Sequence, residues 1–313
     1  MNLKKRLFFT FAVFISLYNF AQGKANILNA KTVAEIGVRS QEQIAADATQ
    51  KPLAYGVVKD DDILWSKVVW EVIDLNQKIN HPFYFPIENN IEASRLSLYN
   101  TLANAVNSKD RTFKMYKNSY LKEKDTISLN KINKEKLAFY CKAIDDVIPF
   151  YPSDITHFKV KGMWFFDKLQ GELKYRLLAI GPILPISLAA KCINFGKISE
   201  NRQRLRDNPN AKIAKIEPLE TTNLEPLYWL YFPEVRQALH NAKVFNPKNG
   251  SRPISFDHLL NARRFSAVIV QEENMYGNRS IKDYIPNNSF FQLLESERIK
   301  EDIRNREMDM WNY

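Results

Sequence analysis

The chain has 313 residues, of which 45% are hydrophobic and 26% are charged, and its formal net charge is +10. This composition is ordinary for a globular protein that buries one large core or two modest ones. After the first residues no stretch is long and apolar enough to cross a bilayer, because Pro182 and Pro185 interrupt the best candidate, which excludes a membrane-spanning mature chain.

Residues 1–21 are predicted to be a secretory signal peptide. Met1–Arg6 is cationic, Leu7–Phe20 is a short apolar run, and Ala21 is a plausible cleavage residue. No cysteine comes directly after the cleavage region, so lipid attachment is not expected. Removal of this peptide takes away three cations and lowers the net charge from +10 to +7.

A basic exported protein does not meet a genome, so nucleic acid is not an expected partner. Anionic envelope polymers, lipid headgroups or acidic proteins fit the charge better, and simple solubility is the other reading.

Cys141 and Cys192 form a disulfide or remain two buried thiols, and their spacing leaves both readings open. With no CxxC and no His/Cys cluster, neither a metal site nor a cofactor is predicted.

In chain order, residues 22–59 are predicted to be a weakly ordered N-terminal arm, which pairs with a neighbouring subunit or is plainly disordered. A core over residues 60–286 follows. Its first element is predicted to be a helix that Asp60–Asp62 caps, with apolar residues three and four apart on one face. These residues are Leu64, Val68, Val72, Leu75 and Ile79.

The middle of the chain mixes helices and strands. A second helix led by Ser97 and a strand over residues 112–119 are predicted, followed by a helix over residues 133–148. A turn at Gly171 precedes a β run over residues 174–180, which Gly181-Pro182 interrupts. The basic segment 199–215 is interpreted as an exposed loop.

The segment "LYWLYF" (227–232) is predicted to be a strand that is apolar on both faces. Leu227, Trp229 and Tyr231 alternate with Tyr228, Leu230 and Phe232. A strand of this kind needs a cover on each face. One cover is the core, and the other is a second layer of this chain or a different subunit, with a sugar-stacking groove as a third reading.

The last elements have clear boundaries. Pro233 opens a helix, Ser255 caps a short helix, and residues 265–271 form a strand. Residues 287–313 are predicted to be a C-terminal amphipathic helix with Phe290, Leu294, Ile299 and Ile303 on one side. The fold class is therefore α+β, with helices and short antiparallel strands. Helix–helix–strand order occurs twice, before residue 120 and again after residue 232, which suggests a divergent duplication.

No catalytic constellation is visible. The chain has no GxSxG, HExxH or phosphate-loop motif, and its four histidines fall in separate elements. Asp145 and Asp146 are adjacent on the predicted helix and point in different directions. We therefore expect no enzyme.

Four segments in one order carry a resemblance to a known family: "DDILWSKVVWEVIDLNQKINHPFYFP", "WFFDK…LLAIGPI", "EPLYWLYFPEVRQALHNAKVFNPKNG" and "RRFSAVIVQEENMYGNRSIKDYI". From about residue 60 to residue 285, the chain resembles the GldN family, called PorN in other Bacteroidota, of type IX secretion and gliding motility.

The resemblance implies a periplasmic structural subunit without enzymatic activity or cofactor. Its implied partners are a GldK/PorK-like outer-membrane lipoprotein, further copies of itself in a ring, and the motor proteins GldL and GldM/PorM. The predicted contact residues are Trp229, Tyr231, Phe245, Arg263, Arg264 and Trp311. The alternative function is an envelope-polymer binding module that meets anionic glycans through Arg202, Arg204 and Arg206.

Overall fold

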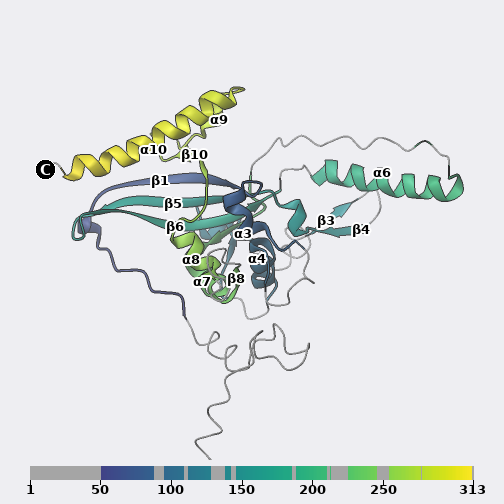
Figure 1. The fold of residues 1–313 in the computed structure, drawn as a ribbon, viewed down its shortest axis with the longest axis horizontal. Helices are drawn as coiled ribbons and strands as arrows, with labels where there is room; N and C mark the ends of the chain where they lie inside the picture. Colours follow the sequence, from purple (N-terminus) through teal and green to yellow (C-terminus); the bar gives the residue numbers. More distant parts are fainter. Residues whose placement is uncertain are drawn as a thin grey trace, which may run out of the picture. The chain divides into compact units, whose positions relative to one another are not determined.

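The structure is a computed structural model, and Figure 1 shows its ribbon. It describes residues 51–87, 95–108, 112–127, 138–141, 146–184, 188–209, 212, 225–244, 254–275 and 277–311, with only the backbone of residues 138–141, 146–149, 188–193, 195 and 311. The predicted signal peptide and most of the predicted arm lie outside these residues. So do the side chains of Cys141 and Cys192, so the disulfide stays a prediction.

The fold is α+β and is built on one antiparallel sheet of six strands in the order β10-β1-β5-β6-β7-β2. Two hairpins, β3-β4 and β8-β9, stand apart from this sheet. The strands are β1 (Ile63–Asp74), β2 (Met115–Tyr116), β3 (Ala138–Cys141), β4 (Asp146–Pro149), β5 (His157–Asp167), β6 (Glu172–Ile183), β7 (Trp229–Tyr231), β8 (Lys243–Val244), β9 (Ile254–Ser255) and β10 (Val268–Glu272).

The helices are short except for two. They are α3 (His81–Tyr84), α4 (Leu98–Asn107), α6 (Leu188–Asp207), α7 (Phe232–Asn241), α8 (Phe256–Asn261), α9 (Ile281–Tyr284) and α10 (Ser289–Trp311), with single 3-10 turns at η2 (Asp60–Asp62), η3 (Lys78–Asn80), η4 (Glu123–Asp125) and η5 (Pro152–Asp154). The Ser97 and Ser255 hydroxyls accept the backbone N–H groups of Asn100 and His258, which confirms both predicted caps. Pro233 lies in the first turn of α7, also as predicted.

The first predicted helix is wrong, because residues 63–74 form the long strand β1. The segment ILWSKVVWEVID is rich in β-branched and aromatic residues, which favour a pleated surface over a helix. Its alternating positions Val69, Glu71 and Ile73 are all buried. The three-and-four spacing of apolar residues was therefore a coincidence in a segment that is apolar on both faces. The duplication hypothesis loses its first matched helix with this correction.

The strands β5 and β6 form the centre of the sheet as one long hairpin. Gly171 adopts φ +62° in its turn, at the predicted position. The predicted interruption at Gly181-Pro182 is wrong, since β6 continues to Ile183. A Cβ at Gly181 would lie 2.4 Å from the Tyr228 carbonyl oxygen, so this glycine allows the segment before β7 to approach the strand closely.

Two further predictions are corrected. The predicted helix over residues 133–148 is replaced by the β3-β4 hairpin. The predicted loop over residues 199–215 is helical up to Asp207, as the end of α6. Arg, Gln, Glu and Leu are good helix formers, so the polarity of this segment did not indicate a loop.

The main core lies on one face of the sheet, under α4, α7 and α8. It contains Ile73, Phe158, Ile180 and Leu230 from the sheet, and Leu102, Val235 and Leu260 from the helices. Figure 1 shows α7 and α8 beside β6, which they contact. The opposite face carries a smaller cluster of Trp70, Tyr116, Ala179 and Trp229. Lys161 extends over the Trp70 ring and donates to the Ser119 carbonyl oxygen, so the chain after β2 covers this face.

The described end of the predicted arm, residues 51–59, has neither helix nor strand. Polar contacts attach it to the core. Arg236 donates to the Leu53 carbonyl oxygen at 2.6 Å, and Arg176 donates to the Gly56 carbonyl oxygen at 3.1 Å. The Tyr55 hydroxyl donates to Asn261 at 2.8 Å, and its ring lies under the Arg236 guanidinium. The arm therefore enters the fold along α7, α8 and β6.

Candidate interaction surface

The helix α10 is fixed to the sheet by one of its faces. Ile299 and Ile303 are buried against Val69, Ile269 and Ile281. The Ser296 hydroxyl, which is fully buried, accepts the backbone N–H of Ile269 at 3.0 Å. Ile269 belongs to β10, the edge strand, so a side chain of the helix satisfies a donor that would otherwise have no partner at the sheet edge.

Ser296→Ala is expected to lower the free energy of unfolding by about 1–3 kcal/mol, because the Ile269 N–H then remains buried without an acceptor. Urea denaturation measures this loss, and hydrogen exchange should quicken at Ile269. Ser289→Ala, an exposed change on the same helix, is the control. Equal stability of the two variants would contradict the assigned role of Ser296.

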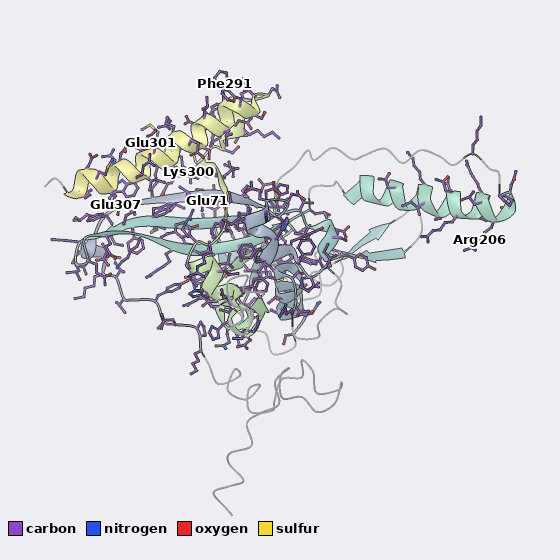
Figure 2. The ribbon with its side chains drawn as sticks, in the orientation of Figure 1. Glu71, Arg206, Phe291, Lys300, Glu301 and Glu307 are labelled. Carbon is purple, nitrogen blue, oxygen red and sulfur yellow. The ribbon has the colours of Figure 1, made fainter. Side chains whose placement is uncertain are left out.

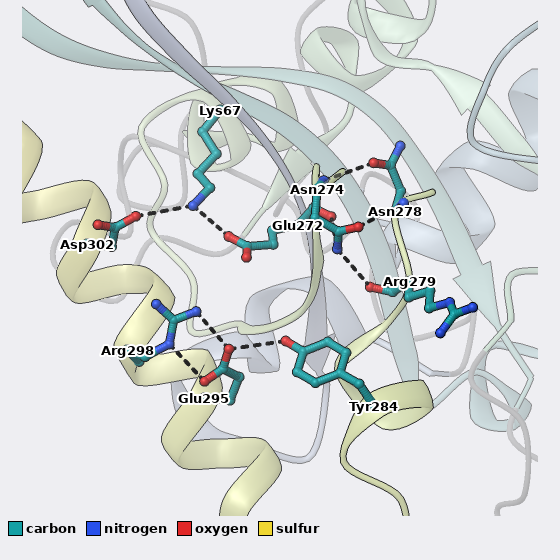
Figure 3. Close-up of polar contacts among 9 residues, drawn as sticks. All are labelled: Lys67, Glu272, Asn274, Asn278, Arg279, Tyr284, Glu295, Arg298 and Asp302. Carbon is teal, nitrogen blue, oxygen red and sulfur yellow. Dashed lines mark hydrogen bonds and ion pairs between the residues drawn. The ribbon is translucent and has the colours of Figure 1, made fainter. Parts of the chain in front are cut away.

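Polar contacts between β1, β10 and α10 add to this attachment (Figure 3). Lys67 on β1 lies 2.6 Å from the Glu272 carboxylate and 3.2 Å from the Asp302 carboxylate. The Lys67 ammonium thus contacts both β10, through Glu272, and α10, through Asp302. Lys67 and Glu272 are largely shielded from water, whereas Asp302 is partly exposed, so the pair with Asp302 adds a modest polar attachment of α10 to the sheet.

A second group of contacts positions the first turns of α10. Arg298 donates to both oxygens of Glu295 at 2.8 and 2.7 Å, and this hydrogen bonding lowers the pKa of the Glu295 carboxyl. The Tyr284 hydroxyl donates to Glu295 at 3.2 Å, while burial and then the Glu295 charge raise the pKa of Tyr284 to about 12. Tyr284 therefore stays a neutral donor that ties α9 to α10.

The other side of α10 begins with an apolar patch, which consists of Phe290, Phe291, Leu293 and Leu294. These side chains are 64%, 54%, 47% and 49% exposed. Figure 2 shows Phe291 directed away from the sheet. A cavity of about 660 Å³ opens beside the patch, between β10, α9 and the start of α10, and Leu293 contributes to its wall. Contiguous apolar area of this kind on a protein surface indicates a contact site.

The prediction that Phe290 and Leu294 lie on the same side of the helix as Ile299 and Ile303 is wrong, because the first two are exposed and the last two are buried. Residues nine positions apart on a helix are separated by about half a turn, because each residue adds about 100°. Phe290 therefore lies opposite Ile299, as Leu294 does opposite Ile303. This spacing was readable from the sequence and would have identified the patch.

The predicted contact residues lie at different depths. Trp229 is 2% exposed and Tyr231 is half-buried, so the chain itself covers the aromatic strand on both faces. Arg263 is half-buried in an ion pair with Glu71, and Arg264 is exposed. Phe245 and the side chain of Trp311 lie outside the described residues. Of the four residues that the structure describes, Trp229 and Tyr231 pack in the same cluster on β7, and Arg263 pairs with Glu71.

The ion pair of Arg263 holds a buried carboxylate in the core. The Arg263 guanidinium donates to both oxygens of Glu71 at 2.8 and 2.9 Å, and Glu71 is 1% exposed. The guanidinium also lies 4.0 Å from the centre of the Tyr175 ring, and the Tyr175 hydroxyl donates to Glu71. Burial and the Glu71 charge raise the pKa of this phenol, so Tyr175 stays protonated. The arrangement therefore satisfies the charge of a buried carboxylate.

Within the described residues, no helix has the length and apolar character needed to span a membrane. The same residues contain no group of three or more histidine, cysteine, aspartate or glutamate side chains that could hold a metal ion.

Comparison with curated proteins found no match. The family model described as "Gliding motility associated protein GldN" matches residues 58–312, which includes every described strand and helix. That match covers well over half of the chain and agrees with the resemblance seen in the four sequence segments, so the chain belongs to the GldN family of gliding motility associated proteins.

Proposed function

We propose that this protein is a structural subunit of the type IX secretion and gliding apparatus, without enzymatic activity. It acts in the periplasm at the outer membrane. There it forms a ring with a GldK/PorK-like lipoprotein and further copies of itself, and it contacts the motor proteins GldL and GldM/PorM. The observation that carries this proposal is family membership over residues 58–312.

The surface of α10 supports an assembly role. Its patch stands on a helix that apolar burial and an ion pair attach to the sheet. A rigid support of this kind lowers the entropy lost when a partner covers exposed apolar side chains. The patch is therefore suited to a permanent neighbour in an assembly.

Co-expression of the full chain with a GldK/PorK-like lipoprotein tests the proposal. We expect the two proteins to co-purify as a ring-sized particle, visible by electron microscopy and with a mass by light scattering far above that of a one-to-one pair. Two proteins that both stay monomeric under these conditions would contradict it.

A second candidate function is binding of an anionic envelope polymer, favoured by one observation. Arg202, Arg204 and Arg206 are all exposed on α6. A module of this kind would be retained on cell-wall sacculi, and the retention would weaken as salt rises. Reversal of the three charges should abolish the retention, whereas unchanged retention would remove this candidate.

A further inference from the structure

The outer face of α10 has a defined pattern beyond its apolar patch. Leu294 is followed along the same face by Glu297 and Glu301, and both carboxylates are exposed. Figure 2 shows Glu301 on α10. The helix as a whole contains six acidic and four basic residues, so its net charge is −2. A partner that covers this face needs apolar side chains and cations at a matching spacing.

The helix α6 of this same chain presents such a face. Arg202 and Arg206 are exposed, and they form no ion pair with other described residues. Ile198 is half-buried and Leu205 is 38% exposed. Both side chains lie on the same side of the helix as the two arginines. The helix contains five basic and two acidic residues, which gives a net charge of +3. All residues from 202 to 207 are exposed, so no part of the chain that the structure describes covers this end.

The two faces match in spacing as well as in charge. Arg202 and Arg206 are four residues apart, as are Glu297 and Glu301, so each pair spans about 6 Å along its helix. When the helices run in the same direction with Arg202 opposite Glu297 and Arg206 opposite Glu301, Ile198 lies opposite Leu293 of the apolar patch. Glu297 and Glu301 already contact Lys300 and Arg304 on their own helix. Exposed pairs of that kind contribute little stability and exchange readily for new partners.

From this match we infer that α6 of one copy docks on the outer face of α10 of the next copy. This inference rests on the self-assembly in the proposed function, and it names the two surfaces through which neighbouring copies meet. The contact is head-to-tail, because each chain offers a basic helix and an acidic helix, and contacts of this type form a ring when the rotation between neighbours closes. The acidic residues of α10 disfavour an anionic lipid surface as the occupant of the patch.

Charge reversal tests the contact in the full chain. One variant carries Arg202→Glu and Arg206→Glu, and a second carries Glu297→Arg and Glu301→Arg. Each variant alone should self-associate at least about tenfold more weakly than the wild type, because two opposed charge pairs become repulsive. Sedimentation velocity measures the association, and circular dichroism checks that the fold is retained.

Mixing the two variants provides the decisive measurement. In an alternating assembly, the reversed α6 of the first variant faces the reversed α10 of the second, and the remaining contacts are wild type. The mixture should therefore regain the wild-type association. Control variants with the same charge changes elsewhere, Lys122→Glu with Lys124→Glu and Asp60→Arg with Asp61→Arg, should associate as the wild type does.

The outcomes separate this inference from the proposed function. If the wild-type chain forms no assembly with its lipoprotein, the proposed function fails and the inference fails with it. If the wild type assembles and either variant assembles equally well alone, only the inference is overturned. A mixture that stays dissociated overturns it too, since the helices then contact other partners.

Discussion

Arg263→Ala is expected to lower the free energy of unfolding by about 3–5 kcal/mol, because it leaves the buried Glu71 carboxylate without its cation. The Tyr175 hydroxyl would remain as a donor to Glu71, but one neutral donor does not compensate a buried charge. The substitution also removes the guanidinium that packs on Tyr175 and Trp164.

Urea denaturation measures this loss, and Arg264→Ala is a matched control. Arg264 is the next residue in the chain and is exposed, so its truncation should change stability by less than about 0.5 kcal/mol. A second variant, Glu71→Gln with Arg263 retained, should also be destabilised. If Arg263→Ala unfolds at the same urea concentration as Arg264→Ala, the pair does not stabilise the core. Arg263 would then be available as the contact residue that the sequence suggested.

Trp229→Ala is expected to lower the free energy of unfolding by about 3–5 kcal/mol, as for other large aromatic side chains removed from a core. Trp229 is packed with Trp70 and Tyr116 on the face of the sheet that the chain after β2 covers. The surrounding aromatic rings come from different strands and cannot all move into the space that is left.

Tyr231→Ala is the comparison, since Tyr231 lies two residues further on the same strand and is half-buried. Its truncation should cost clearly less stability than that of Trp229. Assembly measurements on the two variants then distinguish the core role from a contact role. A Trp229→Ala chain with wild-type stability and weakened assembly would restore Trp229 as a contact residue.

Local signals in the sequence predicted much of the fold. The caps at Ser97 and Ser255, the proline in α7 and the glycine turn at Gly171 act through neighbouring backbone atoms, so short motifs were sufficient. Segments that are apolar on every side were harder to predict. Residues 63–74 satisfy the helical and the strand period at once, and pairing with β5 and β10 decides between them.

The candidate surface was predictable only in part. The sequence correctly showed that "LYWLYF" needs covers on both faces, but it did not show that residues of the same chain provide them. That result depends on contacts between residues far apart in sequence, such as Tyr116 with Trp229. Prediction of the patch on α10 required only a correct count of the angle between residues along one helix. This part of the candidate surface was therefore predictable from the sequence.

The attachment of α10 has a consequence for how the assembly should be dissected. The helix that offers the outer contact face also closes the free edge of β10 through Ser296. A shortened chain that lacks the helix would present an open β-edge, on which any extended segment of another molecule can add as a further strand. Truncation therefore exchanges a specific helical contact for indiscriminate strand pairing. Substitutions on the outer face are the cleaner way to separate assembly from aggregation.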